Sequence, residues 1–259
     1  MIYNNKLVWI TGASSGIGEA LAYEFSKMGA EIIISARRLE ELERVRNKCQ
    51  FPNKVHVRKL DLSLHNEIDQ IASEVIESFG KIDILINNGG VSQRSLVKDT
   101  PFELDKRIMD INYFGTIKLT KAILPTMLKF KKGHIVTITS LTGKFGAPLR
   151  SAYAASKHAL HGFFDTLRSE IWRDGVYITL VCPGYISTNV SVNALTANGQ
   201  PQNKMDEELA NGMKPEKLAK YIIKAIEQKK EELLIGGKET LGVYIKRFFP
   251  KRFSKIIRN

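Results

Sequence analysis

A tyrosine and a lysine stand four residues apart in "SAYAASKHAL", residues 151–160. The residues around them predict a helix, and positions four apart lie on the same face of a helix. A tyrosine phenol, with a pKa of about 10, exchanges protons poorly near neutral pH. A nearby ammonium group stabilises the phenolate and lowers that pKa. Tyr153 and Lys157 are therefore a candidate acid/base pair, although the same spacing also occurs on ordinary helix surfaces.

A glycine-rich segment, "TGASSGIG" at residues 11–18, follows an apolar strand pattern and precedes an amphipathic helix pattern. Glycine lets the backbone turn tightly and approach a ligand closely. The free N–H groups and the positive dipole end of the next helix suit a pyrophosphate. The spacing, G-x-x-x-G-x-G, differs from the G-x-G-x-x-G fingerprint. We expect this turn to bind a dinucleotide through Gly12, Ser14, Ser15, Gly16, Ile17 and Gly18.

The end of the second strand bears on which dinucleotide is bound. An NAD site usually places an acidic residue there to bind the ribose hydroxyls, whereas this chain reads "ISARRLEE". Arg37, together with Arg38, could bind a 2′-phosphate by charge-assisted hydrogen bonds, which favours NADP(H). The alternative is that both arginines are solvated residues at a helix start. Asp61, which ends the third strand, could accept a hydrogen bond from adenine or cap the next helix.

The elements that must position these residues alternate along the chain. Apolar runs predict strands at 6–11, 31–36, 54–60, 82–88, 133–140, 176–184 and 231–237. Amphipathic patterns predict helices between them at 19–29, 39–49, 64–80, 104–130 and 216–228, with Pro125 expected to bend or interrupt the fourth. Alternating strands and helices indicate βαβ units. We expect one doubly wound, Rossmann-type α/β domain over residues 1–259, with about seven parallel strands and helices on both faces of the sheet.

Composition is consistent with a single large domain. The chain has 259 residues, of which 43% are hydrophobic, and no run of eighteen apolar residues. The first residues lack the pattern of a secretory signal. Cys49 and Cys182 form no metal or disulfide spacing, and the histidines lack ligand partners at metal spacing. We therefore expect reduced thiols, no metal site and a cytoplasmic location.

Several further motifs stand in a fixed order and resemble those of the short-chain dehydrogenase/reductase family. The resemblance extends from Lys6 to about Gly237. It rests on "TGASSGIG" at 11–18, "NNGG" at 87–90, "MDINYFG" around Asn112, "TITS" ending at Ser140, "YAASK" at 153–157 and "PGYIST" at 183–188. Each motif alone is weakly specific, but together and in this order they are highly specific.

The resemblance implies hydride transfer between a nicotinamide ring and a carbonyl or alcohol carbon. Tyr153 would be the general acid in reduction and the general base in oxidation. Lys157 would lower the pKa of Tyr153 and bind the nicotinamide ribose. Ser140 would hydrogen-bond the substrate oxygen, and Asn112 would hold a water in a proton relay. Taken singly, Ser140 could equally satisfy its own backbone, and Asn112 could be an ordinary polar group inside a helix.

The resemblance also implies cofactor contacts in three other segments. These residues are Leu62 beside Asp61; Asn88, Gly89 and Gly90; and, along the nicotinamide carboxamide, Pro183, Gly184, Ile186 and Thr188. The irregular stretch at about 184–213 is long for a connection, which is typical of a lid or binding loop. It has no basic cluster for an acidic substrate, so we expect a neutral carbonyl or alcohol substrate of lipophilic character. The alternative function is a catalytically silent nucleotide-binding regulator.

The C-terminal segment, at about 243–259, is basic and aromatic. The net charge of the chain is +12, and the last fourteen residues hold six basic residues and no acidic one. A nucleic-acid partner is not expected, because only this segment interleaves basic and aromatic residues. Its apolar side is expected to pack on the body or on a second subunit of a dimer or tetramer. The alternative is a peripheral membrane contact with anionic headgroups.

Overall fold

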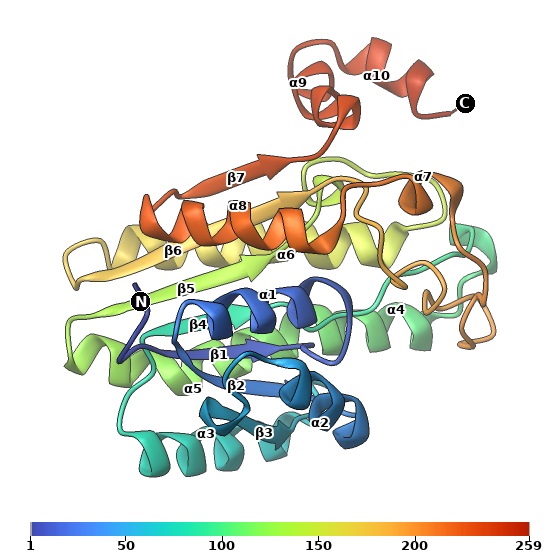
Figure 1. The fold of residues 1–259 in the computed structure, drawn as a ribbon. Coiled ribbons are helices and arrows are strands. Elements are labelled where there is room, and N and C mark those ends of the chain that lie inside the picture. Colours follow the sequence, from blue (N-terminus) through green and yellow to red (C-terminus); the bar gives the residue numbers. More distant parts are fainter. Residues whose placement is uncertain (1, 259) are drawn as a thin grey trace.

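The computed structural model describes residues 2–258 of the chain. Seven parallel strands form one sheet in the order β3-β2-β1-β4-β5-β6-β7 (Figure 1). The strands are β1 Leu7–Thr11, β2 Glu31–Ala36, β3 Val55–Lys59, β4 Ile84–Asn87, β5 Gly133–Ile138, β6 Val176–Pro183 and β7 Glu232–Ile235. The helices are α1 Gly16–Lys27, α2 Leu39–Lys48, α3 His65–Phe79, α4 Phe102–Met109, α5 Gly115–Lys129, α6 Ser151–Glu170, α7 Glu207–Ala210, α8 Pro215–Glu227, α9 Leu241–Phe248 and α10 Pro250–Ile256. The predicted fold class is confirmed.

Helices cover both faces of the sheet, so the inner strands are apolar on both sides. In β2, Ile32 and Ile34 pack in one core with side chains of α1, α2 and α8. Ile33, between them, points to the opposite face and packs with side chains of α3, α5 and α6. Because successive side chains of a strand alternate between faces, a strand buried on both sides reads as a continuous apolar run. This explains why "EIIISA" shows no polar alternation.

The strand order reverses direction at β1, which has β2 on one side and β4 on the other. In open parallel sheets, ligands bind outside the carboxyl ends of the strands at such a switch point. The segments that follow β1, β4, β5 and β6 all leave the sheet at this edge. The fold therefore gathers the glycine turn, the "NNGG" segment, Ser140 and the segment after Pro183.

The helix predicted at 104–130 is interrupted at a different place from the one expected. Residues Asp110–Phe114 form a π-helical turn between α4 and α5, and Asn112 lies within it. Pro125 lies inside α5 without ending the helix. Both Pro125 and Lys121, whose carbonyl loses its usual partner, are exposed, so water can satisfy that carbonyl. Insertions of this π type occur often at functional sites.

The stretch between β6 and α8 is tied down at several points. It contains the short helix α7 and isolated bridges between Gln93 and Leu195 and between Ile186 and Met213. The backbone of Leu195 exchanges hydrogen bonds of 2.8–2.9 Å with that of Ser92 and Arg94. We call residues 184–213 the substrate loop, because the sequence predicts a lid or binding loop here.

The chain ends in α9 and α10, which lie beyond the edge strand β7 (Figure 1). The expected packing on the body is confirmed for part of this segment. Phe253 is buried against Phe145, with ring centroids 4.9 Å apart, and Val243, Ile245 and Ile257 pack around them. Pro250 begins α10, as its lack of an N–H favours. Within residues 2–258, no helix combines the length and apolarity needed to cross a bilayer.

Acid should destabilise this fold through His134, which is buried in β5 with its Nε2 atom 2.8 Å from the Thr179 hydroxyl. Burial, assisted by Lys229, lowers the pKa of His134 to about 4. Between about pH 6.5 and pH 4 the unfolded chain binds a proton at this histidine that the folded chain does not, so folding free energy is lost as the pH falls. We expect a loss on the order of 3 kcal/mol across this window, measured by denaturant unfolding at a series of pH values.

The His134→Gln variant is the matched comparison, because glutamine keeps a hydrogen-bonding group and does not titrate. Its unfolding free energy should fall less steeply with acidification than that of the parent. His161, whose pKa burial also lowers to about 4, leaves a residual slope. Identical slopes in the two proteins would contradict the assignment to His134.

Candidate active site

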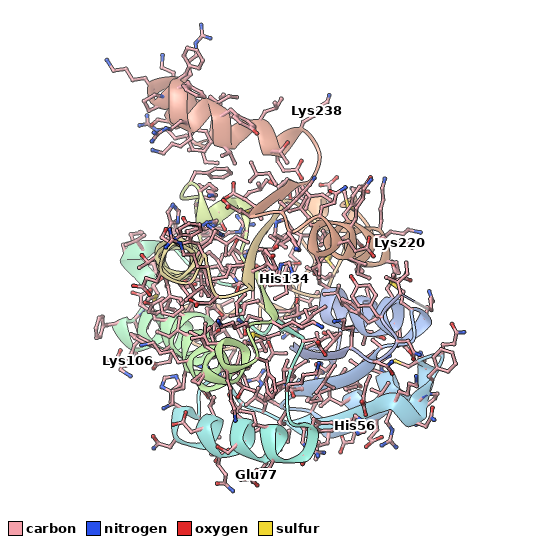
Figure 2. All side chains as sticks on the ribbon, turned by 90° about the vertical axis from the view of Figure 1, so that its left-hand side faces the viewer. His56, Glu77, Lys106, His134, Lys220 and Lys238 are labelled. Atoms are coloured by element: carbon pink, nitrogen blue, oxygen red, sulfur yellow. The ribbon has the colours of Figure 1, made fainter. Side chains whose placement is uncertain are left out.

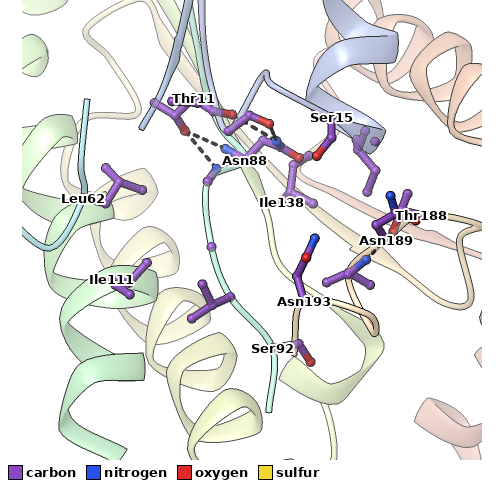
Figure 3. A pocket seen from close by; sticks show the side chains of 18 of the residues that line it. Thr11, Ser15, Leu62, Asn88, Ser92, Ile111, Ile138, Thr188, Asn189 and Asn193 are labelled. Atoms are coloured by element: carbon purple, nitrogen blue, oxygen red, sulfur yellow. Dashed lines mark hydrogen bonds between the residues drawn. The ribbon is translucent and has the colours of Figure 1, made fainter. Parts of the chain in front are cut away.

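A cavity of about 590 Å³ opens at the carboxyl edge of the sheet. Its walls come from the segments after β1, β2, β3, β4, β5 and β6, from α6 and from the substrate loop. Figure 3 labels side chains from the segments after β1, β3, β4 and β6. This volume lies within the usual range for small-molecule sites. All the residues expected from the sequence line this cavity except Gly18 and Asn112, which stand behind its wall.

The glycine turn after β1 adopts a backbone conformation and close contacts that side chains at the glycine positions would prevent. Gly12 and Gly16 adopt positive φ angles of 64° and 59°, a region that favours glycine. A Cβ atom on Gly12 would lie 2.7 Å from the Cα of Gly89, and one on Gly18 would lie 2.5 Å from the Gly12 carbonyl oxygen. Gly18 therefore lets α1 pack against the turn, and the turn itself faces the cavity.

The glycine turn is joined to the segment after β4 by a set of hydrogen bonds (Figure 3). The Thr11 hydroxyl accepts hydrogen bonds of 3.0 Å from the N–H groups of Asn88 and Gly89. The Asn88 carboxamide in return donates to the carbonyls of Thr11 and Gly12, also at 3.0 Å. The side chain of Asn88 thus fixes the turn that faces the cavity.

Two arginines border the cavity where β2 ends. The side chains of Arg37 and Arg38 are exposed, and no carboxylate of residues 2–258 lies within ion-pair distance of either. Across the cavity wall, Asp61 Oδ1 accepts hydrogen bonds from the N–H and hydroxyl of Ser63, at 2.9 and 2.7 Å. Asp61 therefore stabilises the turn before α3 with one oxygen while its residue still lines the cavity.

Tyr153 and Lys157 both lie on α6 and both line the cavity, as their spacing predicts. The Lys157 ammonium donates to the Ile138 carbonyl at 2.8 Å and lies 5.7 Å from the centre of the Tyr153 ring. Burial lowers the pKa of Lys157 to about 8, against the opposing effect of Cys182. The ammonium is thus a partly deprotonatable group held at the back of the cavity.

The pKa of Tyr153 differs from the sequence expectation. Burial raises this pKa, and the groups that act in the opposite direction are the Ser140 hydroxyl and the guanidinium groups of Arg94 and Arg150. Lys157 is not among them, and its ammonium donates a hydrogen bond to the Ile138 carbonyl. The expected lowering of the phenol pKa by Lys157 is therefore absent from this arrangement of the side chains.

The structure shows which groups Ser140 and Asn112 contact, which the sequence left open. The Ser140 oxygen lines the cavity and accepts hydrogen bonds from the N–H and hydroxyl of Thr142, at 3.1 and 2.9 Å. Asn112 is fully buried; its Oδ1 accepts from the Val91 N–H at 2.8 Å, and its Nδ2 donates to the Val91 carbonyl and the Ser156 hydroxyl. The Asn112 side chain therefore ties the "NNGG" segment to α6.

A buried glutamine supports the start of α6, and no sequence motif indicated it. The Gln93 carboxamide oxygen accepts hydrogen bonds from the N–H groups of Ala152 and Tyr153, at 2.9 and 3.3 Å. Its nitrogen donates to the hydroxyls of Ser95, Thr100 and Ser151. Free N–H groups at a helix start need such acceptors. Gln93 thus positions the backbone of Tyr153 from sixty residues away in the chain.

A half-buried ion pair joins the substrate loop to the same region. Asp206 Oδ2 lies 2.5 Å from Arg94 Nη2 and 3.2 Å from Arg150 Nη2. The Asp206 Oδ1 atom accepts a hydrogen bond from Gln202. One carboxylate from the substrate loop therefore pairs with both guanidinium groups near the phenol and offsets one of their two positive charges. The sequence did not predict this contact, because Arg94 and Asp206 are far apart in the chain.

His161, for which the sequence indicated no ligand partners, has two potential ones in space. The ligand atoms of His161, Cys182 and Glu232 lie within 4.8 Å of one another. The Glu232 carboxylate also pairs with the Lys144 ammonium, which supplies the cation at this position. Both cysteines are free, as expected, and both are buried; Cys182 is a core residue of β6.

Comparisons with known proteins agree with this geometry. A protein called dehydrogenase/reductase SDR family protein 7-like from Anopheles gambiae is 47% identical over 239 residues, which is 90% of this chain and 75% of the relative. The one from Drosophila melanogaster is 42% identical over 260 residues, 97% of this chain and 79% of the relative.

Solved structures share the fold. A short-chain dehydrogenase from Streptomyces avermitilis has a TM-score of 0.85 and 26% identity, and the match covers 100% of this chain and 99% of that one. A short-chain dehydrogenase/reductase from Burkholderia phymatum in complex with NAD has a TM-score of 0.86 and 22% identity, over 97% and 96% of the two chains. A metagenomic short-chain oxidoreductase in complex with NADP has a TM-score of 0.76 and 25% identity, over 91% and 98%.

The family model that matches is that of the short chain dehydrogenases, and it covers residues 6–199. This range spans the glycine turn, Ser140, Tyr153, Lys157 and the first part of the substrate loop. The chain therefore belongs to the short-chain dehydrogenase/reductase family of oxidoreductases.

Proposed function

We propose that this protein transfers a hydride between NADP(H) and a carbonyl or secondary alcohol of a neutral, lipophilic substrate. The observation that carries the proposal is the shared cavity. It has the glycine turn and two arginines at one end, and Ser140, Tyr153 and Lys157 at the other. A regulator that had lost turnover would not need these three side chains to face the same space.

The preference for NADP(H) rests on Arg37 and Arg38. The structural relatives include complexes with NAD and with NADP, so the fold is compatible with both. At the end of β2, where an acidic residue would bind ribose hydroxyls, this chain has two exposed guanidinium groups at the cavity edge. A guanidinium group matches the geometry of a phosphate and carries the opposite charge.

In the proposed reaction, the cofactor transfers the hydride and a protein side chain transfers the proton. A bound nicotinamide would supply or accept the hydride. Tyr153 would give its phenolic proton to the carbonyl oxygen in reduction and accept the hydroxyl proton in oxidation. Ser140 would hydrogen-bond the same oxygen. Lys157 would bind the nicotinamide ribose, and its ammonium would stabilise a phenolate at Tyr153 if it turned from the Ile138 carbonyl.

The substrate end of the cavity supports a neutral ligand. Apolar side chains from the substrate loop and its neighbours line it: Val91, Val190, Leu195, Pro201 and Leu209. Asp206 pairs with both nearby guanidinium groups and offsets one of their two positive charges. We retain a cytoplasmic location and a dimer or tetramer as predictions.

The acid/base role of Tyr153 is testable by removing only its hydroxyl. The Tyr153→Phe variant should lose about 10²- to 10⁴-fold in kcat, because a positioned acid contributes this much. Its NADPH affinity should change little, since the phenyl ring stays in place. The measurements are NADPH consumption with a panel of neutral ketones and aldehydes, and nucleotide binding by fluorescence.

Lys157→Ala is the informative companion, because it should lower both the rate and the affinity for NADPH. Near-parental kcat in the Tyr153→Phe protein would exclude the phenol as the acid. NADPH binding without turnover on any carbonyl of the panel would instead favour the regulator.

The cofactor preference is testable at Arg37. The Arg37→Ala variant should bind NADPH about ten- to a hundredfold more weakly, because a hydrogen bond to a charged group contributes about 1.5–3 kcal/mol. NADH lacks the 2′-phosphate, so its affinity should be nearly unchanged. Dissociation constants for both nucleotides, measured by fluorescence titration, give the ratio directly.

Arg46→Ala serves as the control for net charge, because Arg46 lies on α2 away from the cavity and pairs with Glu43. It should leave the NADPH-to-NADH ratio unchanged. An equal loss for both nucleotides in the Arg37→Ala protein, or a parent that prefers NADH, would refute the NADP(H) assignment.

A further inference from the structure

We infer that helices α9 and α10 bind the surface of an anionic lipid membrane. Both views show these helices standing out from the body of the protein beyond Lys238 (Figures 1 and 2). Their inner side packs on the body of the protein, because Phe253 is buried against Phe145 and Leu141. The outward side is defined here as the tail surface. It comprises the exposed apolar residues Leu241, Tyr244, Phe248, Phe249 and Ile256, and the exposed basic residues Lys246, Arg247, Lys251, Arg252, Lys255 and Arg258.

The apolar part of the tail surface is large for so short a segment. Phe248 is 69% exposed, Phe249 57% and Ile256 57%. Single exposed apolar side chains are normal on protein surfaces, whereas a cluster of them marks an interaction site. Aromatic and branched aliphatic side chains of this kind enter the boundary between headgroups and acyl chains.

The charge of the tail surface identifies its partner as anionic. No acidic residue occurs from Lys246 to Arg258. None of these six basic side chains forms an ion pair with any of residues 2–258. The Arg252 guanidinium instead lies 5.7 Å from the centre of the Phe249 ring, so charge and aromatic surface occur together. Each basic residue near an anionic bilayer adds to binding, and these contributions decay with salt.

A second copy of the chain fits this surface less well. Two tail surfaces meeting in a symmetric dimer would bring twelve basic side chains together without an acidic one among them. Nucleic acid would satisfy the charge but would leave the exposed phenylalanine and isoleucine side chains in water unless bases stacked on them. An anionic bilayer satisfies both parts of the surface at once.

Helices α9 and α10, which we call the tail, are attached beside the candidate active site. The Glu239 carboxylate accepts hydrogen bonds from the N–H of Tyr185, at 3.0 Å, and of Gly237, at 2.9 Å. Phe145, which packs on Phe253, follows Ser140 by five residues. The contact of Glu239 with Tyr185 and that of Phe253 with Phe145 join the C-terminal residues to segments that border the cavity. Membrane binding would therefore hold the cavity near lipid-dissolved substrates, a consequence that rests on the proposed function, whereas the binding itself does not.

The experiment is flotation of the intact protein with vesicles of phosphatidylcholine, with and without about 30% phosphatidylserine, at about 50 and about 500 mM NaCl. The parent should float with the anionic vesicles at low salt and be released by high salt. The Lys251→Gln/Arg252→Gln/Lys255→Gln variant should partition about a hundredfold more weakly, as expected for three basic residues. The Phe248→Ser/Phe249→Ser variant should lose at least about tenfold, because its apolar surface no longer enters the bilayer.

The matched control is Trp172→Ser/Arg173→Gln, which removes an exposed aromatic and basic pair at the end of α6. It should float like the parent. All variants change exposed side chains, and unchanged NADPH binding and size-exclusion profiles would show that the fold is kept. These solution measurements also report on the proposed function, which stands or falls independently of flotation.

Three outcomes would overturn the inference. One is a parent that ignores anionic vesicles at low salt. Another is full flotation of the Phe248→Ser/Phe249→Ser variant, which would show adsorption by charge alone. The third is a tail variant that changes the oligomeric state or binding to a DNA duplex while flotation stays constant, which would assign the surface to a subunit interface or a nucleic acid.

Discussion

The contact between the ends of β1 and β4 is the constraint on which the rest of the site depends. Thr11 and Asn88 join the two strand ends by four hydrogen bonds of 3.0 Å between one side chain and the opposite backbone. The approach is so close that a Cβ atom on Gly12 would lie 2.7 Å from Gly89. The glycine turn, the cavity floor and the direction in which α1 leaves the sheet all follow from this contact. A site for a bulky dinucleotide thus begins with backbone packing that excludes side chains.

A second layer of polar contacts places Tyr153 and Lys157, the proposed acid/base residues, on that frame. Gln93 satisfies the N–H groups at the start of α6, and Asn112 joins Val91 to Ser156 one turn later. Both belong to or contact the segment after "NNGG", so the glycine-turn side of the cavity and the helix that carries Tyr153 share one network. Asp206 then pairs with both Arg94 and Arg150 near the phenol. If the substrate loop moved away with Asp206, the two guanidinium groups would stabilise a phenolate at Tyr153 more strongly, because the opposing carboxylate would be gone.

The parts of this protein that sequence could predict are those with a local signal. Strand and helix order follows from apolar periodicity, and the positions of Gly12, Tyr153 and Lys157 in the cavity follow from motifs at element ends. The roles of Gln93 and Asp206 depend on contacts between distant segments, which no short spacing encodes. The π-helical turn at Asn112 was missed for a related reason: Pro125 is the visible helix breaker, but its exposed site lets water satisfy the orphaned carbonyl. The raised pKa of Tyr153 could not be predicted either, because it depends on how deeply the fold buries the phenol.

The tail shows why periodicity alone could not separate packing from an external partner. Its apolar residues fall at mixed three- and four-residue steps, and the structure divides them between two sides of the same short helices. Phe253 covers Leu141 and Cys182, so deleting the whole segment would expose core side chains near Ser140 as well as remove the basic surface. A truncated protein that lost stability and membrane binding together would not distinguish the two roles. Because Phe248 and Phe249 are exposed while Phe253 is buried, substitutions can separate the outward surface from the inward anchor, and only the former bears on a partner.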